Sequence, residues 1–195
     1  MPSKYKAIVI GTSMGGFAAL RTLLPQLPSD FGMPVVIVQH IGSDTDNYWI
    51  HILNKDCAVT VKEADEKEQM LPGVVYTAPP NYHLLIEADE TFSLAVTERV
   101  NYARPAIDVL FESASVVFGK QLVGILLTSA STDGAMGMQA IKAQGGLTIA
   151  QDPATAESPS MPASAIAKNV VDYTLPIDKI IHLVKSIDLN RNPKK

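Results

Sequence analysis

This chain of 195 residues contains a single cysteine, Cys57, so it has no internal disulfide, and this cysteine usage fits a reducing compartment. Charged residues make up only 18% of the sequence and the formal net charge is −4, which argues against a nucleic-acid-binding protein that relies on phosphate contacts. No apolar run approaches the roughly 18 residues that a membrane-spanning helix needs, and the N-terminal apolar stretch is too short for a signal peptide. We therefore expect a cytoplasmic protein with no nucleic-acid partner.

The chain is instead rich in apolar side chains, which make up 47% of its residues and are enough for the core of one domain. We assign residues 1–188 to this domain and residues 189–195 to a polar C-terminal tail. No cluster of His, Cys and Asp has the spacing of metal ligands, so we expect neither a metal nor a cofactor.

Short β-branched runs predict buried parallel strands, and most of them are separated by segments of helical periodicity. The strands are predicted at 6–10, 34–39, 122–127, 147–150 and 170–174, and the helices at 14–25, 44–55, 105–118, 134–144, 162–167 and 176–187. This alternation predicts an α/β fold with a doubly wound, mostly parallel sheet flanked by helices. Three further strand signals, at 74–77, 82–86 and 92–96, have no helix between them and predict a β-hairpin extension at one sheet edge.

The first predicted strand runs directly into the sequence GTSMGG at residues 11–16. A serine between glycines, on a tight turn from a buried strand into a helix, is how a fold exposes a nucleophile, which makes Ser13 a candidate. The backbone N–H of Met14 is then the first candidate donor to an oxyanion. The same turn is also typical of a phosphate site, and Ser13 can equally serve as a helix cap. A role for Ser13 can therefore be assigned only when residues that would act with it are identified.

Two other predicted strands end in candidate partners for Ser13. His40 follows the strand at 34–39, and Asp133 follows the strand at 122–127, at a position where a helix N-cap is also expected. Ligands bind outside the carboxyl ends of the strands of an open parallel sheet, so Ser13, His40 and Asp133 are expected at one edge. A serine, a histidine and a carboxylate form the set that acyl transfer needs.

The order of these residues along the chain narrows the class of hydrolase. An α/β-hydrolase runs Ser, Asp or Glu, then His, with several strands before the serine, whereas here only ten residues precede the motif. The remaining nucleophile and base candidates are weaker, because the cysteine has no obvious base nearby in the sequence and the other histidines are expected on a helix surface, at the start of a hairpin strand and in the terminal helix. They are Cys57, His51, His83 and His182.

Blocks along most of the chain, from about residue 5 to residue 185, resemble those of the CheB-type chemotaxis protein-glutamate methylesterases, in the same order. The blocks are GTSMGG at 11–16, VQH at 38–40, YTAPPNYHL at 76–84, RPAIDVLF at 104–111, and LLT at 126–128 followed by TDGAMG at 132–137. The resemblance implies hydrolysis of glutamate methyl esters on the cytoplasmic helices of chemoreceptors, with deamidation of receptor glutamines as a second activity. It also implies Ser13 as nucleophile, His40 as base and Asp133 as the orienting carboxylate.

The chain departs from the family pattern at three places. Met14 stands where the family usually has Thr, and Ser129, Ala130 and Ser131 replace the usual Gly-Met-Gly. The N-terminal receiver domain of full-length chemotaxis methylesterases is absent, so we expect either a stand-alone form or a fragment of a longer protein. For a stand-alone form, the expected partners are a methyl-accepting chemotaxis receptor or another methylated protein, and a separate response regulator. Contact with the membrane would then come only through the receptor.

These departures leave two alternatives to the enzyme. The substitution at residues 129–131 suggests a catalytically impaired member of the family that acts as a binding module in signalling. A nucleotide-binding domain is disfavoured, because His40 stands where an acidic residue would bind a ribose.

Overall fold

The computed structural model describes residues 5–40 and 47–189. In this part of the chain, seven parallel strands form one sheet in the order β3-β4-β2-β1-β7-β8-β9. The strands are β1 Ala7–Thr12, β2 Val35–Gln39, β3 Thr60–Glu63, β4 Val74–Thr77, β7 Leu122–Leu126, β8 Leu147–Gln151 and β9 Tyr173–Leu175. The predicted α/β fold with a doubly wound sheet is confirmed.

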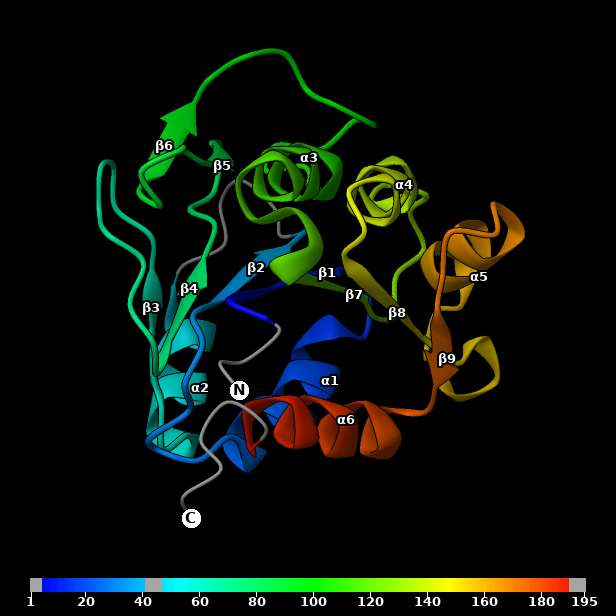
Figure 1. Ribbon diagram of the computed structural model, residues 1–195, viewed down its shortest axis with the longest axis horizontal. Coiled ribbons are helices and arrows are strands. Elements are labelled where there is room, and N and C mark those ends of the chain that lie inside the picture. Colours follow the sequence, from blue (N-terminus) through cyan, green and yellow to red (C-terminus); the bar gives the residue numbers. More distant parts are fainter. Residues whose placement is uncertain (1–4, 41–46, 190–195) are drawn as a thin grey trace.

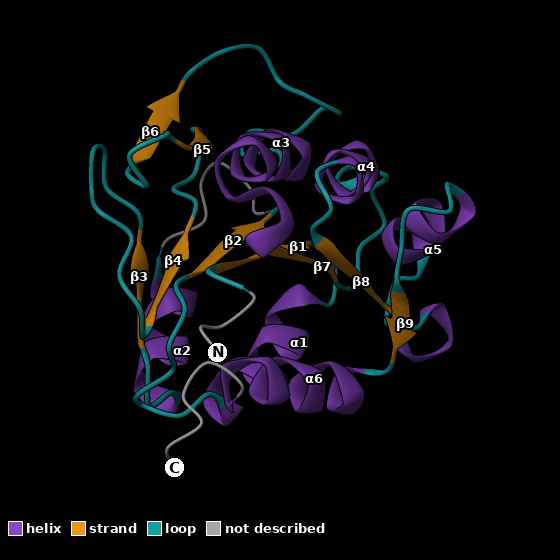
Figure 2. Cartoon of the chain, in the orientation of Figure 1, coloured by secondary structure: helices purple, strands orange, loops and turns teal. Residues whose placement is uncertain are grey.

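Helices cover both faces of the sheet (Figures 1 and 2). The helices α3 Ile107–Phe118, α4 Ala135–Ala143 and α5 Ser160–Ala167 lie on one face, and α1 Gly16–Leu23, α2 Tyr48–Asp56 and α6 Ile177–Leu189 lie on the other. Each face has its own apolar core, because the central strands are buried on both sides. Within the described residues, no helix is both long enough and apolar enough to cross a membrane.

The hairpin is present, but it contains two of the three predicted strands. Strands β5 His83–Ile86 and β6 Phe92–Ala95 pair antiparallel in a separate sheet, and β5 packs against α3. The third predicted strand, at 74–77, is β4, which pairs parallel with β2 and β3 inside the main sheet. Its assignment to the hairpin was wrong, because Val75, Tyr76 and Thr77 are buried as in the other inner strands.

The strand β3 was not predicted. Its four residues, TVKE, include two charged side chains, and as an edge strand it has only β4 as a partner. The predicted tail at 189–195 and residues 44–46 of the predicted helix at 44–55 lie almost wholly outside the described residues. Helix α2 begins at Tyr48.

Candidate active site

Ser13 directly follows β1, the central strand of the sheet, and lies in the turn that leads to α1. Its backbone N–H donates to the carbonyl of Thr128 at 3.1 Å, and its own carbonyl accepts a hydrogen bond from Gln39 Nε2 at 2.8 Å. Thr12 Oγ1 donates to the same Thr128 carbonyl at 3.0 Å. The backbone around Ser13 is therefore held from both neighbouring strands, β2 on one side and the segment after β7 on the other.

The two glycines after Met14 are required by space as well as by conformation. Gly15 is the N-cap of α1 and has a φ of 77°, in the left-handed region that favours glycine. A Cβ on Gly16 would lie 2.2 Å from Gln39 Oε1 and 2.4 Å from Thr12 Oγ1, so a larger residue would displace these two side chains. Met14 is 58% exposed, and its side chain leaves the turn toward solvent. The role of its N–H as oxyanion donor stays a prediction.

His40 occupies the position after β2 that matches Ser13 after β1. Thr12 and Gln39 are partners in the register of the two strands, so Ser13 and His40 are the residues that directly follow this pair on the two adjacent strands. The backbone N–H of His40 donates to the Thr12 carbonyl at 3.0 Å, which continues the pairing beyond the strands. Adjacent strands lie about 4.8 Å apart, so the two candidate residues are neighbours at the carboxyl edge of the sheet.

Asp133 lies beside the imidazole of His40. His40 Nε2 and Asp133 Oδ2 are 2.8 Å apart, and the Asp133 side chain is completely buried. When Nε2 carries the proton of a neutral imidazole, Nδ1 is the nitrogen with a free lone pair. The carboxylate thus favours the tautomer in which Nδ1 can accept a proton.

The carboxylate of Asp133 accepts four further hydrogen bonds. Its donors are the backbone N–H groups of Ile107 at 2.6 Å, Asp108 at 3.2 Å and Gly134 at 3.0 Å, and Asn101 Nδ2 at 2.9 Å. The expected role as N-cap of its own helix is not what the structure shows, because Gly134 is the N-cap of α4. Asp133 instead satisfies the first two N–H groups of α3, a neighbouring helix.

These hydrogen bonds determine the charge of Asp133. Burial by itself would raise the pKa of this carboxyl, but the hydrogen bonds from His40, Asn101 and Ile107 outweigh it, and the pKa lies below its ordinary value. Asp133 is therefore ionised at neutral pH.

Two residues of the site were missed by sequence reasoning. Asp108, 4% exposed, accepts the N–H of Gly137 at 2.7 Å and Asn101 Nδ2 at 2.8 Å. Burial raises its pKa to about 6, and the charge of Asp133 adds to this effect. Only the RPAIDVLF block indicated Asp108, and nothing in the sequence indicated Asn101, which precedes that block in a loop.

Comparisons with known proteins identify the family to which this domain belongs. Residues 8–184 match the model of a protein family described as CheB methylesterase. This chain belongs to the CheB methylesterase family.

Relatives of two lengths match the domain. A protein of Leptospira interrogans, provisionally named a protein-glutamate methylesterase/protein-glutamine glutaminase, is 55% identical over 95% of this chain and 96% of its own length. A Geobacter metallireducens protein-glutamate methylesterase/protein-glutamine glutaminase is 35% identical over 98% of this chain, which spans 55% of that relative. The crystal structure of the Thermotoga maritima CheB methylesterase catalytic domain superposes with a TM-score of 0.91 at 34% identity, covering 94% of this chain and 98% of the other.

Residues 129–131, where this CheB-family domain departs from the family pattern, form side-chain hydrogen bonds to their own backbone segment. Ser129 Oγ accepts the N–H of Ser131 at 3.0 Å, and Ser131 Oγ accepts the N–H of Asp133 at 3.0 Å. The two serine side chains therefore bond the backbone of the segment that delivers Asp133 to the site. Ala130 between them is exposed.

None of the weaker candidates has a hydrogen bond to Ser13, His40 or Asp133 among those of the described residues. His83 is completely buried, where it bonds the carbonyl of Glu98 through Nε2 and the N–H of Ala106 through Nδ1. His51 and His182 are exposed on α2 and α6. Burial and the charge of Asp56 raise the pKa of the Cys57 thiol to about 11, so it stays protonated at neutral pH.

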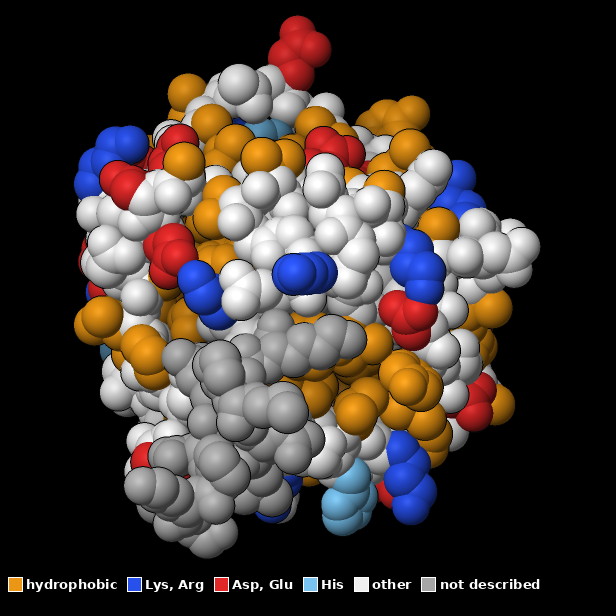
Figure 3. All heavy atoms as spheres, in the orientation of Figure 1, with side chains coloured by type: hydrophobic (Ala, Val, Ile, Leu, Met, Phe, Trp, Pro, Cys, Tyr) orange, Lys and Arg blue, Asp and Glu red, His pale blue; other side chains and the backbone are white. Residues whose placement is uncertain are grey.

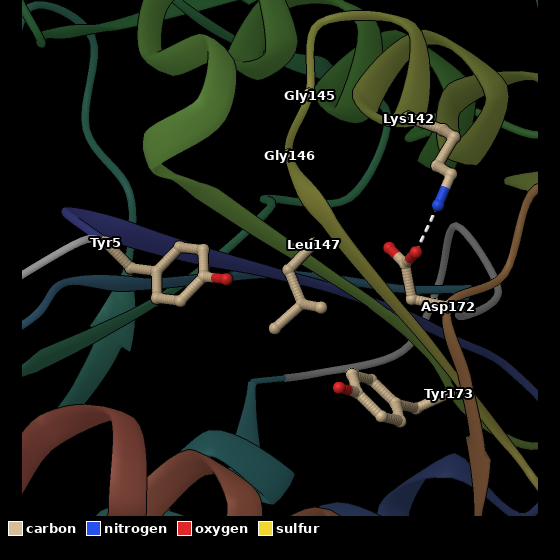
Figure 4. A pocket seen from close by; sticks show the side chains of 7 residues that line it. All are labelled: Tyr5, Lys142, Gly145, Gly146, Leu147, Asp172 and Tyr173. Atoms are coloured by element: carbon tan, nitrogen blue, oxygen red, sulfur yellow. Dashed lines mark hydrogen bonds and ion pairs between the residues drawn. The ribbon is translucent and has the colours of Figure 1, made fainter.

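A hollow of about 430 Å³ lies at the opposite, amino-terminal edge of the sheet (Figure 4). Its lining includes Tyr5, which precedes β1, and Leu147 and Tyr173, the first residues of β8 and β9. The charged groups that line it, Lys142 and Asp172, form an ion pair with each other. Among residues 5–40 and 47–189, no group of three or more His, Cys, Asp or Glu side chains is arranged to hold a metal ion.

Proposed function

We propose that this chain is a protein-glutamate methylesterase that hydrolyses glutamate γ-methyl esters on a methyl-accepting chemotaxis receptor and deamidates receptor glutamines. Ser13 is the nucleophile, His40 the general base and acid, and Asp133 the carboxylate that orients His40. The observation that carries the proposal is the 2.8 Å pair of His40 Nε2 with a buried, ionised Asp133, at the strand end next to Ser13.

In the first half-reaction, Ser13 Oγ attacks the ester carbonyl carbon while His40 Nδ1 takes the serine proton. The carbonyl oxygen becomes an oxyanion, for which the Met14 N–H is the proposed donor. As the C–O bond to the methoxy group breaks, the imidazolium returns the proton to the leaving oxygen and methanol departs. The product is an ester between Ser13 and the receptor glutamate.

In the second half-reaction, a water molecule attacks this ester and His40 takes a proton from the water. The acyl–oxygen bond breaks, Ser13 recovers its proton from His40, and a free glutamate is left on the receptor. A glutamine substrate follows the same route with ammonia in place of methanol. Asp133 stabilises the imidazolium in both halves and stays ionised, in keeping with its lowered pKa.

The face of the molecule in Figure 3 gives no support to a nucleic-acid partner. On the face in Figure 3, Lys and Arg side chains lie among Asp and Glu instead of forming one basic patch. Met14 directly follows Ser13 and Met136 lies three residues after Asp133, and both are large apolar side chains that are 58% and 49% exposed. We place the protein in the cytoplasm, where it reaches the membrane through the receptor, with a separate response regulator as a further proposed partner.

The test is methanol release from a methylated receptor preparation, with Ser13→Ala and His40→Ala as comparisons. We expect both variants to lower turnover on the order of 10⁴-fold or more, because each removes a group that makes or breaks bonds. A folded wild-type protein that releases no methanol and hydrolyses no p-nitrophenyl ester would refute the proposal. Binding to the receptor without turnover would then identify the chain as a binding module.

A further inference from the structure

The loop between β6 and α3 passes over α3 (Figure 1), and the hydrogen bonds of one of its side chains reach the candidate active site. Asn101 lies in this loop with a φ of 50° and is itself exposed to solvent. Its amide nitrogen Nδ2 nevertheless bonds two buried carboxylates, Asp133 Oδ1 at 2.9 Å and Asp108 Oδ2 at 2.8 Å. A side chain from a surface loop therefore contributes to the innermost part of the site.

The chemistry of the amide explains this arrangement. An asparagine NH₂ group has two hydrogens, one for each carboxylate, so a single nitrogen satisfies both acceptors. Without it, the two buried carboxylates would lose the donor that they share, and the repulsion between their negative charges would cost more free energy. Asn101 is thus the bridge that lets Asp108 and Asp133 share one enclosed space.

The bridge also fixes the orientation of Asp133. Oδ2 faces His40 and the N–H of Ile107, whereas Oδ1 accepts from Asn101 and from the backbone N–H groups of Asp108 and Gly134. Among these hydrogen-bond partners, Asn101 and His40 are the ones that bond through side chains. Removal of the Asn101 amide leaves Oδ1 with its two backbone donors alone, so the carboxylate is held less firmly and can shift and lengthen its bond to Nε2.

We propose that Asn101 is a positioning residue for the hydrolysis, which holds the Asp133 carboxylate in the orientation that His40 needs. This inference rests on the proposed function, since it assigns Asn101 a part in the reaction of Ser13, His40 and Asp133. It makes the loop between β6 and α3 a component of the catalytic apparatus, although Asn101 itself need not touch the substrate.

The main variant is Asn101→Gly, because glycine keeps the left-handed backbone while removing the amide. The matched control is Asn169→Gly, since Asn169 is also exposed, has a φ of 56° and lies at the end of α5, away from the site. We expect Asn101→Gly to lower kcat about tenfold and to leave KM within about twofold, as for the loss of one hydrogen bond to a charged group. Asn169→Gly should keep both parameters.

Two further variants separate positioning from a merely structural role. In an Asp133→Ala background, Asn101→Gly should change kcat by less than about twofold, because the residue through which it acts is gone. Asn101→Asp is nearly isosteric but replaces the donor by a third carboxylate, and should lower kcat more than Asn101→Gly does. Equal tenfold losses with and without Asp133 would overturn the proposal, as would a raised KM at unchanged kcat.

A readout that does not require turnover completes the design. The proton on His40 Nε2 can be followed by NMR, and in Asn101→Gly we expect it to shift and to exchange with water faster than in Asn169→Gly. Failure of the proposed function would appear as a wild-type protein without Ser13-dependent turnover. If the wild type is active but Asn101→Gly matches Asn169→Gly in both kcat and the proton signal, the positioning role alone is wrong.

Discussion

Asp133 and Asp108 each satisfy backbone donors in the first turn of the other's helix. The Asp133 carboxylate, one residue before the N-cap of α4, accepts the N–H groups of Ile107 and Asp108 at the start of α3. The Asp108 carboxylate accepts the N–H of Gly137 in α4 at 2.7 Å. The free N–H groups of a helix start favour a negative charge, so each helix start stabilises the carboxylate that the other supplies. The packing of α3 on α4 and the orientation of Asp133 are therefore set together.

Asp133→Asn tests this double role. The amide would present an NH₂ group to donors that now bond a carboxylate oxygen, and it would disfavour the imidazole tautomer that Asp133 selects. We expect kcat to fall on the order of 10⁴-fold and the free energy of unfolding to fall by about 1–3 kcal/mol. Ester hydrolysis and urea unfolding measure the two effects. Asp178→Asn, at an exposed site on α6, is the control and should show neither.

Asp108→Asn should change how stability depends on pH. Burial raises the pKa of Asp108 to about 6, so between about pH 4 and pH 6 the folded protein holds a proton that the unfolded chain has lost. The free energy of unfolding therefore falls as the pH rises through this range, and the variant lacks this contribution. The free energy of unfolding of Asp108→Asn, relative to that of the wild type, should therefore be higher at pH 7 than at pH 4 by on the order of 1–3 kcal/mol. The same difference in unfolding free energy at both pH values would contradict the assigned protonation.

The turn that carries Ser13 can be tested with a pair of glycines. Gly15 and Gly73 have φ values of 77° and 76°, so alanine costs both positions the same backbone strain, about 1–2 kcal/mol. A Cβ at Gly73 has no neighbour closer than 3.7 Å, whereas at Gly15 it would lie 2.8 Å from Glu157 Cβ and 3.0 Å from Thr128 Oγ1. We expect Gly15→Ala to lower the free energy of unfolding by more than Gly73→Ala does and to reduce ester hydrolysis. Gly73→Ala should keep full activity. Equal effects would show that the turn is not held as tightly as the contacts indicate.

Ser131→Ala tests the segment that departs from the family pattern. Its hydroxyl oxygen accepts the N–H of Asp133 at 3.0 Å, and the variant leaves that buried donor without this partner. We expect a loss of about 1–2 kcal/mol in thermal or urea unfolding and a reduced kcat. Ser186→Ala removes an exposed hydroxyl on α6 and should be neutral. If Ser131→Ala is neutral too, the two serines do not support Asp133.

The sequence was sufficient for the features that depend on local pattern. Buried parallel strands are continuous apolar runs, and the residues after them meet at one edge, so Ser13, His40 and Asp133 could be predicted as neighbours. The position of β4 could not, because the short run at 74–77 resembles a hairpin strand until its partners β2 and β3 are known. Its period and length carry no information about which sheet it joins.

The remaining site residues depend on contacts between distant segments. Asp133 was expected to cap its own helix, since the sequence around it shows only the nearest helix start. Its true donors, in α3 and in the loop before it, are 25 or more residues away along the chain. Asn101 lies in a loop with no pattern of its own, and only the fold brings its amide between two carboxylates.

Covalent labelling with a fluorophosphonate tests the central claim most directly, because the reagent reacts with a serine that a neighbouring base activates. Mass spectrometry of the digested protein should find the adduct on the peptide that contains Ser13, and His40→Ala should abolish it while leaving the protein folded. A folded wild-type protein without an adduct, or an adduct that forms equally well in His40→Ala, would contradict the assignment of Ser13, His40 and Asp133 as the catalytic residues.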